Sequence, residues 1–362
     1  MVTDNMIGSL RRGWRGVKCG FRSRRGVRES NGSTGNMGKT VEKWDGSDSP
    51  EGVVVSDADQ GVNKTVSLWD KSDEVYEIDG FKVYWELLEE VRDYQNQMMT
   101  NGKDEREYYA PFFPEDKELS DLTGLIIGCN YGENSPVVAM AKTTAFGKLI
   151  VVDIAKGLLE RQAQITNRMG LNHKIEYRCM DLNTESLREK TRYDFIYSLG
   201  TIHHLETLER LFSEINDILR KDGIFYMREY VGPSYIQFTD TQVGIVNRIL
   251  AGLPEHLKKD RLGNIKNKAW RPSIEEVRAG DPSEAVRSQD IMGVVREKLD
   301  ILTCNMTGGT ILAPLLHGIA GNFERADAER AVLKCLIVLE QVLIEAGVIP
   351  SDYVSLIARS TP

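Results

Sequence analysis

Two short stretches of the sequence combine residue types that bind nucleosides. Gly128-Cys129-Asn130-Tyr131-Gly132 follows an apolar run and precedes a helical stretch. Small residues there let backbone N–H groups approach a ligand closely, and asparagine is the usual substitute for glycine in the left-handed conformation. Asp153 ends the next apolar run, where a carboxylate can accept both hydroxyl groups of a ribose. A tight strand-to-helix turn and a helix N-cap are the plainer explanations of these two features.

Three further groups are candidates for contact with the rest of a ligand. Asp181 follows a third apolar run, where its carboxylate could accept an adenine amino hydrogen while Met180 packs on the ring. Capping of the segment after Leu182 is the alternative role of Asp181. His203 and His204 follow a fourth apolar run. Because adjacent side chains in regular backbone diverge, we expect only one of the two imidazoles to face a substrate.

The elements that must position these residues are read from the hydrophobic pattern. Short apolar runs at 125–127, 148–152, 175–178, 195–198 and 223–227 alternate with helical stretches at 136–144, 158–169 and 205–219. Strands alternating with helices at this spacing predict right-handed crossovers and a parallel, doubly wound sheet. Ligands bind such a sheet at the C-terminal ends of its strands, which is where the candidate residues lie.

The pattern changes after the fifth run. Residues 232–298 contain polar helical stretches interrupted by prolines, which predicts an inserted cap. Residues 299–303 and 310–316 are candidates for two further strands, although the second could instead begin a helix. A final amphipathic helix is expected to end near Gly347. Before the sheet, apolar residues at 84, 87, 88 and 91 share one helical face and predict either a packed helix or a lid.

Composition and charge restrict the class of protein. The 362 residues carry a formal charge of −8, which disfavours wrapping of nucleic acid by bulk charge. No apolar run approaches the roughly 20 residues of a membrane span. The five cysteines have neither paired nor metal-ligand spacing, which favours a reducing, cytoplasmic location. Residues 1–30 hold eight basic and two acidic side chains. This segment is expected to be a solvated tail, an organellar targeting segment, or a contact for nucleic acid or phosphate.

The motifs together resemble the class I S-adenosylmethionine-dependent methyltransferases. The resemblance covers about 120–232 and rests on the glycine loop, Asp153, Asp181, Tyr193-Asp194-Phe195-Ile196-Tyr197-Ser198-Leu199-Gly200, His203-His204-Leu205 and Leu219-Arg220-Lys221-Asp222-Gly223. A weaker similarity of 228–234 and 281–288 points to a branch that modifies sugars or other small metabolites. The resemblance implies that S-adenosylmethionine is bound by the following residues: Gly128, Asn130, Gly132, Asp153, Ile154, Met180, Asp181, Leu182, Leu199 and Gly200.

Two positions depart from the family pattern. The usual acidic residue two positions before the first glycine is Ile126, and the central glycine of the loop is Asn130. The amino end of the methionine moiety must therefore be held differently, by Asn130 or by the N-terminal helices. The fold implied is a seven-strand-type, Rossmann-like α/β sheet with an N-terminal helical lid and a C-terminal helical cap. We expect a tail at 1–64, a lid at 65–118, the cofactor-binding core at 119–232, a cap at 233–298 and completing strands and helix at 299–362.

The expected reaction is in-line transfer of a methyl group to a small-molecule acceptor. His203, His204 or Glu229 could remove a proton from an acceptor hydroxyl. Asp281, Glu284 and Arg287 could bind a polar acceptor or lie on a solvated charged helix. No metal site is expected, because Asp194 begins its strand and Asp153 is assigned to the ribose. A homodimer is compatible with the sequence.

Two rival functions remain open at this stage. An NAD(P)-dependent oxidoreductase also uses a glycine turn and an acidic residue after the second strand. Ser135 stands where that fingerprint needs its third glycine, three residues after Gly132. A non-catalytic binding protein that kept the fold is the other rival.

Overall fold

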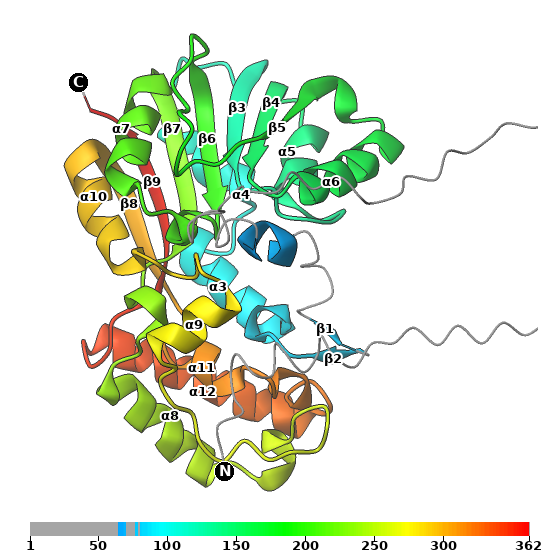
Figure 1. The fold of residues 1–362 in the computed structure, drawn as a ribbon, viewed down its shortest axis with the longest axis vertical. Coiled ribbons are helices and arrows are strands. Elements are labelled where there is room, and N and C mark those ends of the chain that lie inside the picture. Colours follow the sequence, from blue (N-terminus) through cyan, green and yellow to red (C-terminus); the bar gives the residue numbers. More distant parts are fainter. Residues whose placement is uncertain (1–63, 70–76, 79, 362) are drawn as a thin grey trace, which may run out of the picture.

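The computed structural model describes residues 64–69, 77–78 and 80–361. A mixed sheet with helices on both faces forms one end of the molecule, and a helical lobe forms the other (Figure 1). The expected basic tail, 1–64, lies outside the described residues except for Lys64. No helix among the described residues is long and apolar enough to cross a bilayer.

Seven strands form the main sheet in the order β5-β4-β3-β6-β7-β9-β8. The first five in that order are parallel: β5 (Ile175–Cys179), β4 (Phe146–Asp153), β3 (Leu122–Ile127), β6 (Tyr193–Leu199) and β7 (Leu219–Tyr230). Two more strands, β9 (Tyr353–Ser360) and β8 (Leu299–Gly308), complete the sheet, with β9 antiparallel to both of its neighbours. The doubly wound α/β fold expected from the sequence is thereby confirmed.

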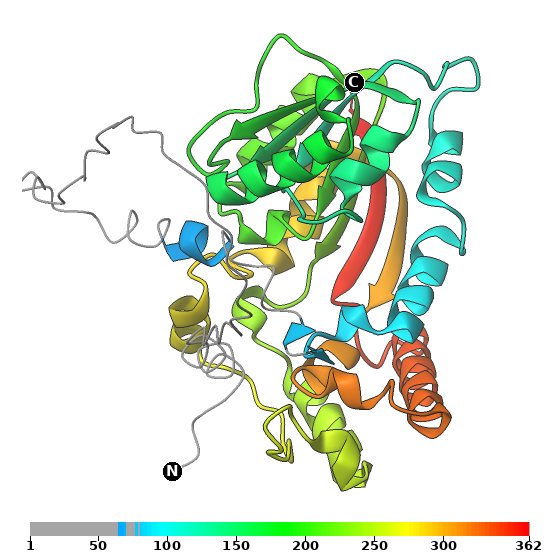
Figure 2. The ribbon, with the colours of Figure 1, turned by 90° about the vertical axis from the view of Figure 1, so that its right-hand side faces the viewer.

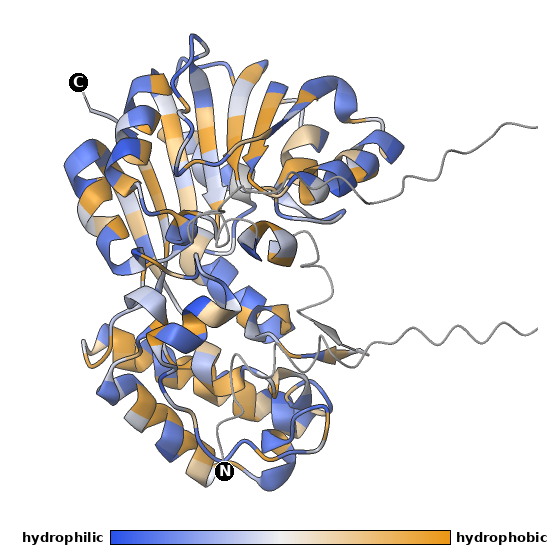
Figure 3. Ribbon diagram, in the orientation of Figure 1, coloured by the Kyte–Doolittle hydropathy of each residue, from blue (hydrophilic) through white to orange (hydrophobic). Residues whose placement is uncertain are grey.

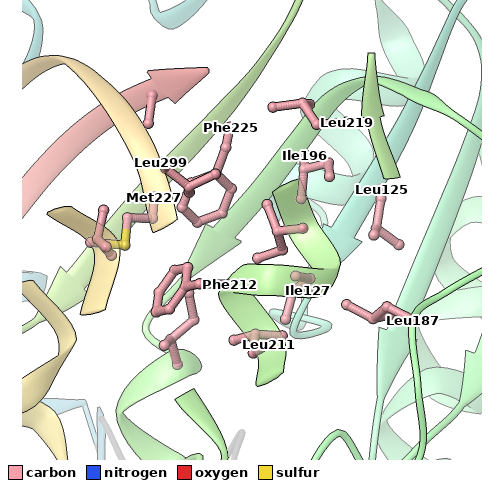
Figure 4. Close-up of a cluster of buried hydrophobic side chains, with 14 of the residues drawn as sticks. Leu125, Ile127, Leu187, Ile196, Leu211, Phe212, Leu219, Phe225, Met227 and Leu299 are labelled. Atoms are coloured by element: carbon pink, nitrogen blue, oxygen red, sulfur yellow. The ribbon is translucent and has the colours of Figure 1, made fainter. Parts of the chain in front are cut away.

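Helices cover the two faces of this sheet because its strands are apolar on both sides. α5 (Pro136–Lys142) and α6 (Lys156–Arg168) lie on one face, and α7 (Leu208–Ile218) and α10 (Ile291–Lys298) on the other. Successive residues of β3 illustrate the pleat, since Leu125 and Ile127 join the core under α7 whereas Ile126 joins the core under α5. Apolar residues concentrate along the strands in Figure 3, and Figure 4 shows side chains of α7 facing those of the strands.

The helical lobe has a core of its own. It contains α8 (Asp240–Gly252), α11 (Leu312–Leu316) and α12 (Asp327–Glu345), against which the residues from Trp85 to Tyr94 pack. α3 (Glu89–Thr100) runs from this lobe along the sheet edge, where Asn305 of β8 donates a hydrogen bond to the Met99 carbonyl (2.8 Å; Figure 2). Short elements complete the chain: β1 (Glu77–Ile78), β2 (Phe81–Lys82), α4 (Glu105–Tyr109) and α9 (Ile274–Gly280).

Three local expectations differ from the structure. Residues 310–316, left open between strand and helix, contain α11, whose first N–H groups at Ile311 and Leu312 donate to the Glu340 carboxylate. The seventh strand is instead β9, which no apolar pattern predicted. The single helical face expected across 84–91 is interrupted, because Leu88 has an extended backbone and α3 begins after it.

Strand register brings the predicted site residues to one edge of the sheet. Ile127 is level with Val152 of β4 and with Ser198 of β6, so the chain leaves these three strands at the same height. The order also reverses at β3, because β4 and β5 lie on one side of it and β6 and β7 on the other. Ligands of doubly wound sheets bind at this kind of switch point. The candidate site therefore lies at the C-terminal ends of β3, β4, β6 and β7.

Candidate active site

The loop after β3 has a backbone that requires glycine. Gly128 has φ +92° and Gly132 has φ +115°, both outside the range that other residues adopt readily. A Cβ atom on Gly128 would lie 1.9 Å from Thr201 Oγ1, so this turn packs directly against the end of β6. Gln162 of α6, which is fully buried, holds the other end of the loop by accepting a hydrogen bond from Gly132 N (2.8 Å).

Asp153 links the ends of β3 and β4. Its Oδ2 accepts a hydrogen bond from Cys129 N (2.7 Å), and its Oδ1 accepts one from Ala155 N (2.8 Å). The N-cap of α6 is Ala155, so Asp153 is not the helix cap that was its alternative role. The carboxylate is partly exposed at the sheet edge. A carboxylate offers about four acceptor positions, so it can accept hydrogen bonds from more than one partner.

Asn130 lies between the glycine loop and the end of β6. Its Nδ2 donates to the Leu199 carbonyl (3.4 Å), and its Oδ1 is buried without a hydrogen-bond partner among the described residues. Gly200 follows with φ +58° and ends the strand. A buried amide oxygen without a donor is costly, so this atom is suited to a donor supplied by a ligand.

The residues after β5 close a turn and join the core. Asp181 accepts hydrogen bonds from Asn183 N (2.8 Å) and Thr184 Oγ1 (3.0 Å), so it closes a turn, close to its alternative role. Leu182 is buried in the core under α7, and Met180 packs against the same core. Contact of these residues with an adenine ring stays a prediction. Ile154 is partly exposed beside them.

Glu229 is a buried carboxylate at the end of β7, with 2% of its surface exposed. Its Oε2 accepts hydrogen bonds from Thr201 N (3.0 Å) and Ile202 N (2.7 Å). Its Oε1 accepts from Tyr230 N (2.8 Å) and lies 2.5 Å from His203 Nδ1. Four donors occupy both oxygens, which fixes the turn after β6 and orients the His203 ring.

The structure brings both histidines into one cluster, contrary to the expectation that only one would face it. They lie in the short 3₁₀ turn η5 (Ile202–His204), not in regular helix or strand, and their ring centroids are 4.1 Å apart. His204 Nδ1 lies 3.0 Å from Ser283 Oγ. His203 Nε2 lies 3.8 Å from Glu284 Oε1. The assumption of a regular backbone was therefore wrong at this turn.

The segment after α9 supplies the opposite wall of this cluster. Ser283 Oγ donates to Asp281 Oδ1 (2.7 Å), which also accepts from Thr65 Oγ1 (3.0 Å). Trp69 Nε1 donates to Asp281 Oδ2 (3.1 Å), and the indole meets the His204 ring edge to face, with centroids 5.2 Å apart. The helical residues 64–69 are thus fastened over the histidines through a buried carboxylate.

The pKa values within the cluster are strongly perturbed. Burial disfavours protonation of His203, but the negative charges of Glu229, Glu284 and Asp281 outweigh it and raise its pKa to about 9. Burial and the adjacent positive charge of His203 lower the pKa of His204 to about 3. Burial raises the pKa of Glu284, although His203 opposes the shift. Near neutral pH the His204 ring is therefore uncharged.

Sequence reasoning found some of these residues and missed others. Of the three charged residues considered in the cap, Asp281 and Glu284 reach the histidines, whereas Arg287 turns away and pairs with Glu209. Gln162 was missed altogether, and Trp69 was expected only in the packed helix or lid, without a role at the site. A mid-helix glutamine and a tryptophan of the N-terminal segment carry no local signal for contact with a loop far along the chain.

Comparison with known proteins identifies the domain. Residues 125–227 match a family model described as a methyltransferase domain. The probable S-adenosylmethionine-dependent methyltransferase CRG1 of Saccharomyces cerevisiae is 30% identical over 115 residues, which are 32% of this chain and 38% of that protein. The match thus spans less than two fifths of the yeast protein.

Solved structures with a broader but weaker likeness include the [4+2]-cyclase SpnF, with 14% identity, a TM-score of 0.43 and coverage of 83% of this chain and 95% of that one. Another is geranyl diphosphate C-methyltransferase from Streptomyces coelicolor A3(2), with 13% identity, a TM-score of 0.43 and coverage of 83% and 97%. The matched residues, 125–227, contain the glycine loop, Asp153 and both histidines. Residues 125–227 therefore match a methyltransferase domain, and part of the chain is similar to a probable S-adenosylmethionine-dependent methyltransferase.

Proposed function

We propose that the chain transfers the methyl group of S-adenosylmethionine to a hydroxyl group of a small, polar acceptor. The observation that carries the proposal is the juxtaposition of two sets of groups along one sheet edge. The glycine loop and Asp153 lie at the ends of β3 and β4, and the histidine cluster lies at the ends of β6 and β7. Nucleoside and acceptor would thus bind side by side across the switch point.

On the cofactor side, Gly128 and Gly132 give backbone access to the methionine part, and Asp153 holds the ribose. Asn130 Oδ1 is assigned to the amino group of the methionine moiety, because it is buried and lacks a donor among the described residues. The adenine is assigned to the side chains after β4 and β5. These are Ile154, Met180, Asp181 and Leu182. The end of β6, Leu199-Gly200, would face the methyl group.

On the acceptor side, the groups are polar and only partly exposed. His203, His204 and Glu284 converge there, with Asp281 and Ser283 behind them. In the transfer step the acceptor oxygen bonds to the methyl carbon while the carbon–sulfur bond breaks, and its electron pair leaves with sulfur. The hydroxyl proton passes from the oxygen to an imidazole of the cluster or to solvent water. Alignment of oxygen and methyl carbon supplies much of the rate gain.

Glu229 is reassigned from proton acceptor to positioning residue. Its two oxygens already accept four hydrogen bonds, so a substrate proton would have to displace one of them. Its role is to hold the turn that carries the histidines. Removal of the proton then falls to the groups that face the acceptor.

Equilibrium binding of S-adenosylhomocysteine tests the cofactor half of the proposal. The full chain should bind it saturably and should not bind NADH. Asp153→Asn should weaken binding about 10- to 100-fold, as expected for charge-assisted hydrogen bonds. The exposed Asp300→Asn is the matched control and should bind like the parent. Binding of NADH alone would favour the oxidoreductase, and equal affinity of Asp153→Asn and parent would refute the ribose assignment.

A screen of hydroxylated metabolites by mass tests the transfer itself. We expect a gain of one methylene in a product that forms only with S-adenosylmethionine present. Saturable cofactor binding without methylation of any acceptor in a broad panel would favour the non-catalytic alternative. Products from sugars or other polyols would support the small-metabolite branch.

A further inference from the structure

We propose that His203, His204 and Glu284 bind a divalent transition-metal cation, which holds an oxygen of the acceptor. Each residue offers one ligand atom, and these atoms all lie within 4.8 Å of one another. Two imidazole nitrogens and one carboxylate on one side of an ion leave coordination positions open for a substrate. This donor set suits Zn²⁺ and Fe²⁺. The role at the acceptor rests on the proposed function, but binding of the cation does not.

The hydrogen bonds around both rings favour a metal site. Histidines that bind metals usually donate their other ring N–H to a carboxylate or another acceptor. His203 Nδ1 is held by Glu229, which leaves Nε2 turned toward Glu284. His204 Nδ1 lies beside Ser283 Oγ, which is itself tied to Asp281. Both rings are therefore oriented from behind by acidic groups, directly or through a hydroxyl.

The groups that would face the cation have unused binding capacity. His204 Nε2 is buried and has no hydrogen-bond partner among the described residues. The Glu284 carboxylate, on a side chain that is 31% exposed, accepts no hydrogen bond there; it faces His203 at 3.8 Å and the negative charges of Asp281 and Glu229. A buried nitrogen without a partner calls for an explanation, and a cation would satisfy it together with the carboxylate.

The distances between the ligand atoms are close to those of a site with a bound cation. Ligand atoms each about 2.1 Å from a common cation lie about 3–4 Å from one another. The separation of His203 Nε2 and Glu284 Oε1, 3.8 Å, is already in this range. The whole set, within 4.8 Å, needs side-chain shifts of about 1 Å to close on an ion.

Titration of the full chain with Co²⁺ alone tests the proposal. Bound metals are first removed with a chelator, and binding of Co²⁺ is then measured by the visible absorption of the protein-bound ion. We expect one saturable equivalent. Glu284→Gln and His204→Gln should each weaken binding at least 10-fold, and Zn²⁺ should displace the cobalt. His173→Gln is the matched control, because His173 is exposed and far along the chain from the cluster, and it should bind like the parent.

The outcomes separate the cation site from the proposed function. Glu284→Gln removes only a charge from a side chain without hydrogen bonds, so its fold can be verified by unchanged thermal melting and binding of S-adenosylhomocysteine. Co²⁺ binding that is unaffected by both variants, or absent from the parent, overturns the cation site. Full methyl transfer by a metal-free chain would identify the imidazoles as bases instead. Cation binding without binding of S-adenosylhomocysteine would refute the proposed function and leave the site standing.

Discussion

Replacement of Glu229 by glutamine tests how the turn after β6 is held. The carboxylate accepts hydrogen bonds from Thr201 N, Ile202 N, Tyr230 N and the His203 ring. A glutamine amide has only one oxygen, so its NH₂ group must face some of these donors. If the NH₂ faces Tyr230 and His203, the imidazole can change tautomer and accept, but Tyr230 N–H stays unpaired. The opposite orientation leaves two backbone donors unpaired.

The orientation of the glutamine amide that leaves fewer donors unpaired determines the expected loss of unfolding free energy. One buried backbone N–H without an acceptor costs about 1–3 kcal/mol, and loss of charge weakens the bonds that remain by about another 1 kcal/mol. We therefore expect Glu229→Gln to lose about 2–4 kcal/mol of unfolding free energy. For a domain of this size, such a loss lowers the melting temperature by roughly 5–10 °C. The substitution keeps the volume of the side chain, so no cavity contributes.

Thermal and denaturant unfolding of three chains would check this reasoning. Glu118→Gln is the matched control, because Glu118 is exposed, and it should stay within about 0.5 kcal/mol of the parent. Binding of S-adenosylhomocysteine should change little in Glu229→Gln at temperatures where it is folded. If Glu229→Gln unfolds together with the parent and the control, the buried carboxylate does not hold the turn as described.

Three other substitutions have outcomes that follow from single contacts. Gly128→Ala should cost about 1–3 kcal/mol in scanning calorimetry, because its φ is +92° and the new methyl would overlap Thr201; unchanged stability would contradict this. Lys117→Met should cost about 1–2 kcal/mol by urea unfolding, because the buried Asp194 loses the nearer of its two cations, at 2.8 Å, and keeps only Arg220 at 3.3 Å; parental stability would show that Arg220 alone suffices. Burial raises the pKa of Asp352 from 3.8 to about 7, so the native state binds this proton more tightly than the unfolded state does. The free energy of unfolding should therefore fall by on the order of 4 kcal/mol as the pH rises from about 4 to 7. Asp352→Asn should lack this decline, and identical pH profiles of the two chains would refute the assignment.

The parallel half of the sheet was predictable because its signals are local. Four of the five runs are short apolar segments, and the strands they form, β3, β4, β6 and β7, are buried on both faces. The remaining run, 175–178, forms the edge strand β5, which is only partly buried. β9 lacked such a signal. Its residues Tyr353–Ser360 follow the last helix and pair between β7 and β8, and no property of a single segment reveals which two strands it will separate.

The approach of the glycine loop to Asp153 could be derived from the sequence, whereas the arrangement of the histidine cluster could not. Gly128 and Asp153 follow strands that pair directly, so chain order and register suffice to bring them together. The approach of Glu284 and Asp281 to the histidines depends on the path of 231–280 around the sheet edge. The convergence of both imidazoles depends on a 3₁₀ turn whose shape is set by Glu229, a residue 26 positions after His203.

The wall of the histidine cluster formed by Asp281, Ser283 and Glu284 has a consequence for how such an enzyme diversifies. These residues lie beyond the stretch shared with other methyltransferases, 125–227, as does the helix at 64–69 that clamps onto Asp281. If the proposed function holds, the part of the gene that selects the acceptor is separate from the part that binds the methyl donor. Exchange of 281–285 between homologous chains should redirect selectivity while the nucleoside cradle is inherited intact.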